Sequence, residues 1–359
     1  MNHIAQIQQK ISERNIDALL ITNEKNQYYS CGFPFTDGYV LVTRNGAWLI
    51  TDSRYIEAAE QTVDSEIRVL LYDRTHTGED HLREILKSEK AERLFAEDQH
   101  LSYARFNQLG QSLETALLPS GSLLSDLRAS KDENELRYMI AAQRISEAAL
   151  EETLPMIRPG MTEREVAAEL VYQMLRNGSE GNSFDPIVVT GKNTSKPHGV
   201  PGDTVIMPGD FLTMDFGCIK NGYCSDMTRT VAVCSASDEM KNIYGIVLKA
   251  QLAGIAAARA GIPGCEIDSA SRSVIQDAGF GSCFGHGFGH SLGLDVHEGP
   301  SLNPRETRLM PENSVCSAEP GIYVPGRFGV RIEDVMILRA AGSEVITKAP
   351  KEELILVGL

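Results

Sequence analysis

The sequence predicts a protein of mixed α/β (α+β) class with two domains, and three observations support this. The chain has 359 residues, which exceeds the length at which a single hydrophobic core stops growing. Hydrophobic residues make up 42% of the chain, which supports well-packed cores. Helical and strand patterns alternate through the first third, up to a turn-rich Pro-Ser-Gly-Ser segment at 119–122. We therefore expect one domain over residues 1–125 and a second over residues 126–359.

The elements of the first domain follow from the spacing of its apolar residues. Ile4, Ile7 and Ile11 are spaced to lie on one face of a helix. Short apolar runs then predict strands, and a longer segment at 103–113 predicts a helix. The expected strands are 18–21, 39–42, 48–50, 67–71 and 94–96.

Two capping-box patterns introduce the second domain. Ser130 with Glu133 predicts the start of a long helix, and Thr162 with Glu165 predicts the start of another. These helices are expected to run to about residues 156 and 177, followed by strands at 187–190, 211–216 and 223–233 and by helices at 241–260 and 267–278.

Composition excludes several classes of function. The formal net charge of −15 would repel a phosphate backbone, so nucleic-acid binding is disfavoured. No apolar run is long enough for a membrane span, and the N-terminal residues lack the apolar stretch of a secretory signal. The seven cysteines are an odd number without a CxxC pair, which argues against a disulfide framework and a thiolate zinc site. We expect a cytoplasmic protein.

Two aspartates in a predicted hairpin are the first candidate site residues. Asn221-Gly222 is the dipeptide most favoured in a two-residue hairpin turn, and residue 220 should then face residue 223. In this register Asp226 lies opposite Gly217, two positions from Asp215, so both aspartates project from one face. A solvated face is the simpler interpretation, but the flanking apolar residues indicate buried strands. Paired buried carboxylates need a cation.

Histidines and glutamates supply two further clusters. His286, His290 and His297 lie close together in a glycine-rich segment, and their spacing is not that of an H-E-x-x-H helix. A lone histidine is more often an ordinary core or surface residue, but three together are harder to dismiss. Glu319 and Glu333 interrupt apolar strands, although one could be a surface residue and the other the partner of an arginine.

Together the clusters offer four carboxylates and one imidazole, which would balance two divalent cations. Oxygen-rich ligation with one nitrogen suits manganese, with cobalt, zinc or iron as alternatives. Two ions could share a water, lower its pKa towards neutrality and present hydroxide to a polarised carbonyl. That is amide hydrolysis without a nucleophilic side chain.

These residues resemble the motifs of the pita-bread metallopeptidases, in the Xaa-Pro branch that contains prolidase and aminopeptidase P. The resemblance rests on MDFG, SDMTRT, GHSLGL, AEPG and RIED, and HSLGLDVHE favours this branch over methionine aminopeptidases. It implies a creatinase-like N-terminal α/β domain and a C-terminal pita-bread domain with a central, mostly antiparallel curved sheet and flanking helices. It also implies five metal ligands, which are Asp215, Asp226, His290, Glu319 and Glu333, with Asp226 and Glu333 shared between two ions.

The resemblance implies roles for the residues around the ligands. His297 would donate a hydrogen bond to the scissile carbonyl or to the tetrahedral oxyanion, and His198 would contact the substrate near proline. His286 would line the proline pocket. Tyr323 and Arg331 would form an orienting network around the metals.

The function that the resemblance implies is hydrolysis of Xaa-Pro bonds in small proline-containing peptides, by a homodimeric dipeptidase or aminopeptidase. A non-catalytic binding module of the same fold and a creatinase-like C–N hydrolase are the alternatives. A dipeptidase needs a cation for the free carboxylate that follows proline, and Arg305, with Arg308 nearby, is our candidate. A surface loop whose arginines pair with Glu306 or Glu312 is an equally good interpretation.

Overall fold

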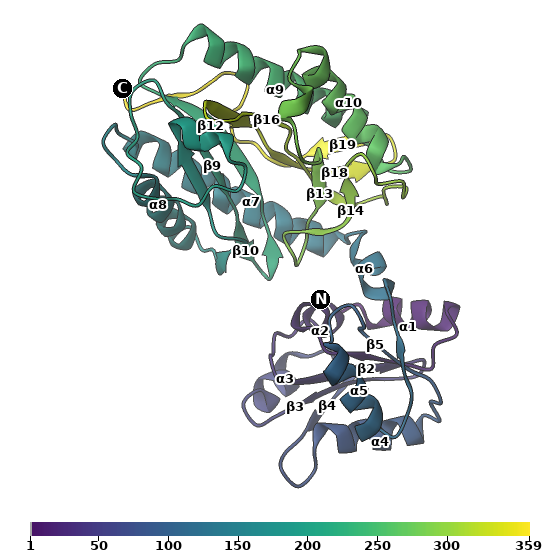
Figure 1. Cartoon of the computed structure of the whole chain (residues 1–359). Helices are drawn as coiled ribbons and strands as arrows, with labels where there is room; N and C mark the ends of the chain where they lie inside the picture. Colours follow the sequence, from purple (N-terminus) through teal and green to yellow (C-terminus); the bar gives the residue numbers. More distant parts are fainter. Residues whose placement is uncertain (1) are drawn as a thin grey trace. The chain divides into compact units, whose positions relative to one another are not determined.

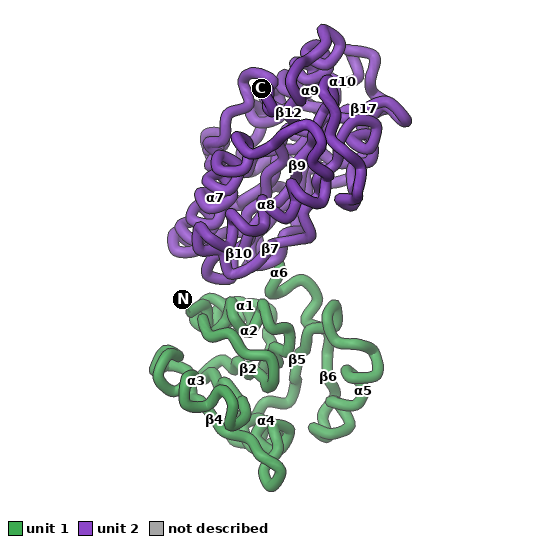
Figure 2. Tube along the Cα trace, turned by 90° about the vertical axis from the view of Figure 1, so that its left-hand side faces the viewer, with its two compact units in different colours: residues 1–127 green, residues 128–359 purple. Residues whose placement is uncertain are grey.

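The computed structural model describes residues 2–359 and divides into two compact units, Met1–Leu127 and Arg128–Leu359 (Figure 2). The division falls after Leu127, whereas the sequence argument placed the boundary after residue 125. The mixed α/β class expected from the sequence is confirmed, because both units combine helices with sheets (Figure 1). None of the helices in residues 2–359 has the length and apolar character needed to cross a bilayer.

The N-terminal unit is built on one six-stranded mixed sheet with the strand order β4-β3-β2-β1-β5-β6. Strands β1, β2 and β3 pair in antiparallel fashion, while β4, β5 and β6 join in parallel. The strands are β1 (Ala18–Ile21), β2 (Gly38–Thr43), β3 (Ala47–Thr51), β4 (Ile67–Leu71), β5 (Leu94–Ala96) and β6 (Leu117–Pro119). The helices are α1 (Ile4–Glu13), α2 (Glu24–Cys31), α3 (Ile56–Thr62), α4 (Gly78–Ser88), α5 (Tyr103–Ser112) and α6 (Leu123–Arg128), the last of which ends one residue past the unit boundary.

The core of the N-terminal unit is apolar. Leu20, Leu41 and Ile50 are fully buried in the sheet and pack with Leu82 and Leu109 from the helices. The predicted helical face is confirmed, because α1 buries its three isoleucines. This unit therefore gains its stability in the ordinary way, by removing apolar surface from water.

The C-terminal unit contains two larger sheets and two pairs of helices (Figure 1). One sheet has the order β20-β12-β9-β8 and the other the order β14-β13-β15-β18-β19, and their pairings are antiparallel except for β12 with β20. The mostly antiparallel arrangement expected for this part of the chain is thus confirmed. Helices α7 and α8 pack with each other and next to the first sheet, and α9 and α10 form the second pair.

The bounds of these elements follow. The helices are α7 (Glu133–Thr153), α8 (Glu163–Arg176), α9 (Asp238–Ala257) and α10 (Gly264–Asp277), with short 3₁₀ turns at Leu154–Met156, Gly191–Ser195 and Gly281–Cys283. The strands between α8 and α9 are β7 (Gly181–Asn182), β8 (Ile187–Thr190), β9 (Phe211–Phe216), β10 (Cys218–Lys220), β11 (Tyr223–Cys224) and β12 (Met227–Val233). The later strands are β13 (Gly289–Ser291), β14 (Glu298–Leu302), β15 (Val315–Ala318), β16 (Gly321–Val324), β17 (Phe328–Arg331), β18 (Asp334–Arg339), β19 (Gly342–Val345) and β20 (Leu356–Val357).

The start of α7 differs from the prediction. The capping box is formed by Asp132 and Glu135, not by Ser130 and Glu133. The Asp132 carboxylate accepts from the backbone N–H of Glu135 at 2.8 Å, and the Glu135 carboxylate accepts from the backbone N–H of Asp132 at 2.8 Å. Ser130 instead donates to the Glu312 carbonyl at 2.7 Å. The other predicted box, Thr162 with Glu165, is confirmed.

Candidate metal centre

The hairpin that carries the two aspartates has the predicted register. Lys220 pairs with Tyr223 and Asp215 pairs with Thr228, so one register holds from the turn into β9 and β12. Asn221 and Gly222 have φ angles of 49° and 76°, as a type I′ turn requires. The run expected at 223–233 is interrupted between β11 and β12, and Asp226 lies in this interruption.

Gly217 explains how the two arms of the hairpin approach each other at Asp226. A Cβ atom on this glycine would lie 2.0 Å from the Ser225 carbonyl oxygen and 2.3 Å from Ser183 Oγ. No other residue could occupy the position without moving the backbone. Ser225 Oγ also accepts from the Cys218 N–H at 2.9 Å. The neighbouring backbone of Asp226 is therefore held tightly in place.

The aspartates are buried, as the flanking residues predicted. Asp215 is 8% exposed and Asp226 4% exposed, while Met214, Phe216 and Met227 are fully buried. Burial raises the pKa of Asp226 well above its usual range, and the charge of Asp215 raises it further. Two carboxylates in this position need positive charge nearby.

The remaining expected ligands come from the second sheet and the segments next to it. His290 lies in β13, Glu319 directly follows β15, and Glu333 directly precedes β18. Backbone bonds hold both glutamates, since the Glu319 N–H donates to the Phe288 carbonyl at 2.8 Å and the Glu333 N–H donates to the Thr228 carbonyl at 3.1 Å.

The ligand atoms converge. One ligand atom from each of Asp226, His290 and Glu333 lies within 4.8 Å of the others. His290 Nε2 is 3.2 Å from Glu319 Oε1 and 3.6 Å from Asp226 Oδ2. The structure thus brings these four residues together. They and Asp215 border the same cavity. We refer to the five residues, Asp215, Asp226, His290, Glu319 and Glu333, as the ligand cluster.

The imidazole of His290 is oriented for ligation. Its Nδ1 atom lies 3.1 Å from the Ser291 carbonyl oxygen, so Nδ1 carries a proton and Nε2 faces the carboxylates. Burial opposes a charge on this ring, but the hydrogen bond and charge of Glu319 raise the pKa of His290 to about 9. In the metal-free protein a proton on Nε2 therefore supplies part of the positive charge that the carboxylates need.

Two buried carboxylate oxygens provide the sharpest test of whether this cluster fits a metal. Asp215 Oδ1 and Glu333 Oε1 are inaccessible to solvent and have no hydrogen-bond partner within the part of the chain that the structure describes. Burial raises the pKa of Glu333 well above its usual range, with Asp226 as the next cause. Unpaired buried carboxylate oxygens are costly unless they bind a cation. With one imidazole nitrogen, this oxygen-rich set fits divalent ions.

A directed chain of hydrogen bonds orients Asp215. Arg331 donates to Asp215 Oδ2 at 2.5 Å and to the Tyr323 hydroxyl at 2.8 Å. His286 Nδ1 donates to the Gly287 carbonyl at 2.8 Å, so Nε2 of the neutral ring is an acceptor and the Tyr323 hydroxyl donates to it at 3.0 Å. Burial lowers the pKa of His286, which agrees with a neutral ring. The chain occupies one oxygen of Asp215 and leaves Oδ1 for a cation.

Sequence reasoning missed two hydroxyl residues that orient other carboxylates. Thr228 donates to Glu333 Oε2 at 2.7 Å and accepts from Arg331 Nε at 3.0 Å. Ser317 donates to Glu319 Oε1 at 3.1 Å and accepts from the His290 N–H at 3.0 Å. Thr228 could have been found, because the predicted register places it directly opposite Asp215.

The ligand cluster borders a cavity of about 480 Å³. His198, His286 and His297 also line it, together with residues that sequence reasoning did not select, which include Phe184, Ile187 and Val296. The His297 and His290 rings lie 4.2 Å apart between centroids. Burial lowers the pKa of His297, and the charge of His290 lowers it further. A neutral imidazole therefore stands at the edge of the ligand cluster.

The arginines proposed for a substrate carboxylate lie in an exposed loop. Arg308 donates to both carboxylate oxygens of Glu306, at 2.9 and 2.5 Å, as the alternative interpretation of a surface loop anticipated. Arg305 is exposed, and it is not one of the described residues that line the cavity. Its role as a substrate-binding residue stays a prediction.

The fold and this site together define a metallopeptidase with an additional N-terminal domain. The chain belongs to metallopeptidase family M24, whose sequence pattern matches residues 137–340, and residues 3–130 match the Creatinase/Prolidase N-terminal domain. The family and the creatinase-like fold expected from the sequence are therefore confirmed.

Relatives span the whole chain. An uncharacterised peptidase of Bacillus subtilis, YqhT, is 37% identical over 345 residues, which cover 95% of this chain and 96% of that protein. The Xaa-Pro dipeptidase structure from Bacillus anthracis has a TM-score of 0.94 and 39% identity, covering 99% of each chain. The X-Pro aminopeptidase structure from Thermotoga maritima has a TM-score of 0.90 and 37% identity, covering 99% of this chain and 100% of that one.

Proposed function

We propose that this protein is an Xaa-Pro peptidase that cleaves small proline-containing peptides with two divalent ions. One observation carries the proposal: the expected ligands border one cavity, and among residues 2–359 no donor reaches the buried Oδ1 of Asp215 or Oε1 of Glu333. The names of the Bacillus anthracis and Thermotoga maritima relatives, an Xaa-Pro dipeptidase and an X-Pro aminopeptidase, support the substrate class.

The five residues of the ligand cluster would hold the ions, with Asp226 and Glu333 shared between them. When bound, the ions would lower the pKa of a water and polarise the scissile carbonyl, so that the amide could be hydrolysed without a nucleophilic side chain. The hydrogen bonds of Thr228, Ser317 and Arg331 fix the carboxylates beforehand, so little reorganisation is needed when the ions bind.

The histidines would act on the substrate. His297, kept neutral by its lowered pKa, can donate a hydrogen bond to the carbonyl oxygen as negative charge develops on it. Both ring nitrogens of His286 are already occupied, by Gly287 and Tyr323, so this ring offers only apolar contact. Such a wall suits a proline ring. His198 borders the same cavity and would contact the residue near proline.

Finer features of the proposal are the metal, the assembly and the compartment. Oxygen-rich ligation favours manganese, with cobalt, zinc or iron as alternatives. We propose a homodimer in the cytoplasm, with an N-terminal domain over residues 1–125 and a catalytic domain over residues 126–359. The free state of all seven cysteines supports a reducing compartment.

The test is peptide cleavage by metal-reconstituted protein. Ala-Pro should release free proline if the protein is a dipeptidase, and Ala-Pro-Ala should release alanine if it is an aminopeptidase. Ala-Ala and Ala-Ala-Ala serve as controls for the proline requirement, and Asp226→Asn serves as the inactive variant. Cleavage of the controls at the same rate, or no cleavage of either proline peptide by fully loaded protein, would contradict the proposal.

A further inference from the structure

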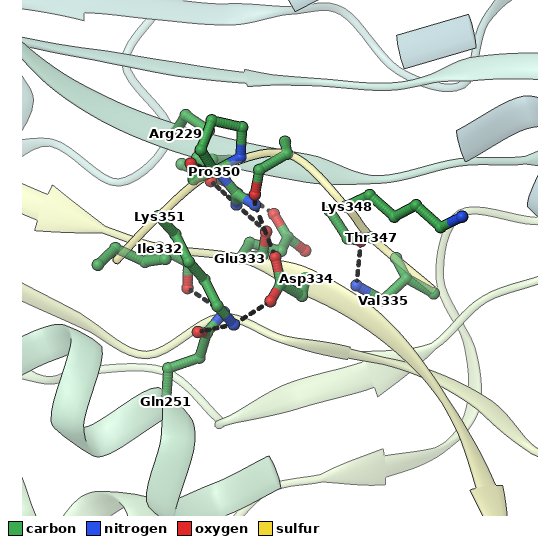
Figure 3. Close-up of polar contacts among 12 residues, drawn as sticks. Arg229, Gln251, Ile332, Glu333, Asp334, Val335, Thr347, Lys348, Pro350 and Lys351 are labelled. Carbon is green, nitrogen blue, oxygen red and sulfur yellow. Dashed lines mark hydrogen bonds and ion pairs between the residues drawn. The ribbon is translucent and has the colours of Figure 1, made fainter. Parts of the chain in front are cut away.

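A buried network of charged and amide side chains bonds to the main chain beside the glutamates of the ligand cluster, and Figure 3 shows its contacts around Glu333 and Asp334. None of its four side chains is among the residues that line the cavity. Arg229 of β12 is its largest member and is 1% exposed. Each of the five N–H groups of its guanidinium can be matched with an acceptor. The acceptors are the carbonyls of Thr228, Glu333, Ala349 and Pro350 and the Asp334 carboxylate, at distances from 2.6 to 3.1 Å.

Lys351 completes the network from the C-terminal part of the chain. Its ammonium group donates to the second carboxylate oxygen of Asp334 and, at 2.7 Å, to the Gln251 side-chain oxygen. The Gln251 amide then donates to the carbonyls of Ala318 at 3.1 Å and Ile332 at 3.3 Å. We call Arg229, Gln251, Asp334 and Lys351 the back network.

The back network reaches the main chain at both glutamates. Ala318 and Ile332 immediately precede Glu319 and Glu333, and Arg229 bonds the carbonyl of Glu333 itself. Helix α9 supplies Gln251, β12 supplies Arg229 and the segment after β19 supplies Lys351, so three distant parts of the unit hold these two backbone positions.

Stability alone is a weak reason for such a network. Taking Arg229, Lys351 and Asp334 out of water carries a desolvation penalty, and apolar residues of similar volume often serve a fold as well or better. Charged and amide groups do offer what apolar residues lack, which is directional bonds to chosen carbonyls. In this network those carbonyls belong to Glu333 and to the residues that precede both glutamates.

We propose that Arg229, Gln251, Asp334 and Lys351 are positioning residues that set the spacing of the Glu319 and Glu333 carboxylates and thereby the affinity of the metal centre. Residues 349–351, which supply two carbonyls and the ammonium group of the network, are then a working part of the site, although they do not line the cavity. This inference rests on the proposed function to the extent that both glutamates are metal ligands.

The test compares two lysines of the same segment. Lys351→Met removes the buried ammonium, and Lys348→Met makes the same change on an exposed side chain that extends away from the network (Figure 3). Manganese affinity is measured by calorimetry without peptide, and the absorption spectrum of the cobalt-loaded protein reports the geometry of the ligands. We expect Lys351→Met to weaken manganese binding at least tenfold and alter the cobalt spectrum, and Lys348→Met to match the wild type.

Gln251→Leu provides a second variant if Lys351→Met does not fold, since it removes bonds to Ala318 and Ile332 without leaving an unpaired charge. It should weaken manganese binding several-fold and lower kcat with little change in KM. A merely structural role would lower the melting temperature while leaving metal affinity and the cobalt spectrum unchanged, and that result in both variants would overturn the inference. Since metal binding is measured without peptide, a wild type that binds metal but cleaves no Xaa-Pro bond would overturn only the proposed function.

Discussion

Glu97 in the N-terminal unit and Glu333 in the C-terminal unit are both buried, but their carboxylates differ in hydrogen bonding. In the N-terminal unit Glu97 is 5% exposed, and its oxygens accept from the backbone N–H groups of Thr22 and Asn23 and from the Asn26 amide, at 2.5 to 2.9 Å. In the C-terminal unit Glu333 is 1% exposed, yet Oε1 has no donor among the described residues. A buried carboxylate whose oxygens accept hydrogen bonds stabilises the fold, whereas a buried carboxylate oxygen without a donor indicates a site for a cation.

Asp226→Asn should have the largest effect, because under the proposed function it weakens a ligand shared by both ions. We expect turnover to fall by about 10³-fold or more, and the fold to survive because a buried charge is removed. His286→Ala alters a pocket wall and should cost clearly less. Steady-state kinetics on variants of measured metal content will decide, and equal losses at equal metal content would show that the ligand assignment is wrong.

His297→Ala should lower kcat by about 10²–10³-fold, the range for losing one donor to a developing oxyanion. The side chain lines the cavity at the edge of the ligand cluster, so metal occupancy should remain as in the wild type. Elemental analysis of the purified variant checks occupancy alongside the kinetics. Loss of an ion from the variant would make His297 a ligand instead.

Metal removal should destabilise the protein more as the pH rises from about 4 towards neutrality. The folded-state pKa values of Asp226 and Glu333 are raised above about 3.9 and 4.3, the usual values, so the unfolded chain releases these protons first. Their contribution favours the folded state when both are protonated and is lost as pH rises through the raised values. Metal at about 100 times its Kd should restore about 2.7 kcal/mol.

Thermal unfolding with manganese and with chelator, measured at several pH values, checks this prediction. The gap between the two melting temperatures should widen with pH. A gap that is constant or narrows would mean that the carboxylates do not repel one another in the metal-free protein.

Glu97→Ala should have the smallest effect of the four, about 1–3 kcal/mol, because it leaves partly buried backbone N–H groups without an acceptor. Chemical denaturation at matched metal concentrations will measure it. The loss should be the same with and without manganese, since this carboxylate already has its donors. A metal-dependent loss at Glu97 would remove the distinction between the two glutamates.

Local patterns in the sequence predicted much of the fold and the hairpin of the site. The Asn221-Gly222 turn determined the register, and that register extends to the pairing of Asp215 with Thr228. The prediction of the cap of α7 was wrong because two capping-box patterns overlap at residues 130–135. Asp132 with Glu135 forms the cap, and Glu135 also accepts from the buried Tyr223 hydroxyl at 2.9 Å, a tertiary contact that no local pattern reveals.

The back network could not be predicted from the sequence. Lys351 stands in a charged stretch, Lys-Glu-Glu, that resembles a solvated surface segment. Its burial depends on Asp334 and Gln251, which are 17 and 100 residues away in the chain. For the same reason the sequence could not show that Asp215 Oδ1 and Glu333 Oε1 lack hydrogen-bond donors among residues 2–359, because this depends on contacts from the whole unit.

The close contact at Gly217 limits how this protein can change during evolution. Side chains alternate between the two faces of a strand, so one residue gained or lost between the turn and Asp226 would send its carboxylate to the opposite face. Any side chain at position 217 would push the two arms apart. Genes that encode active forms of this site should therefore keep the number of residues between Asp215 and Asp226 constant.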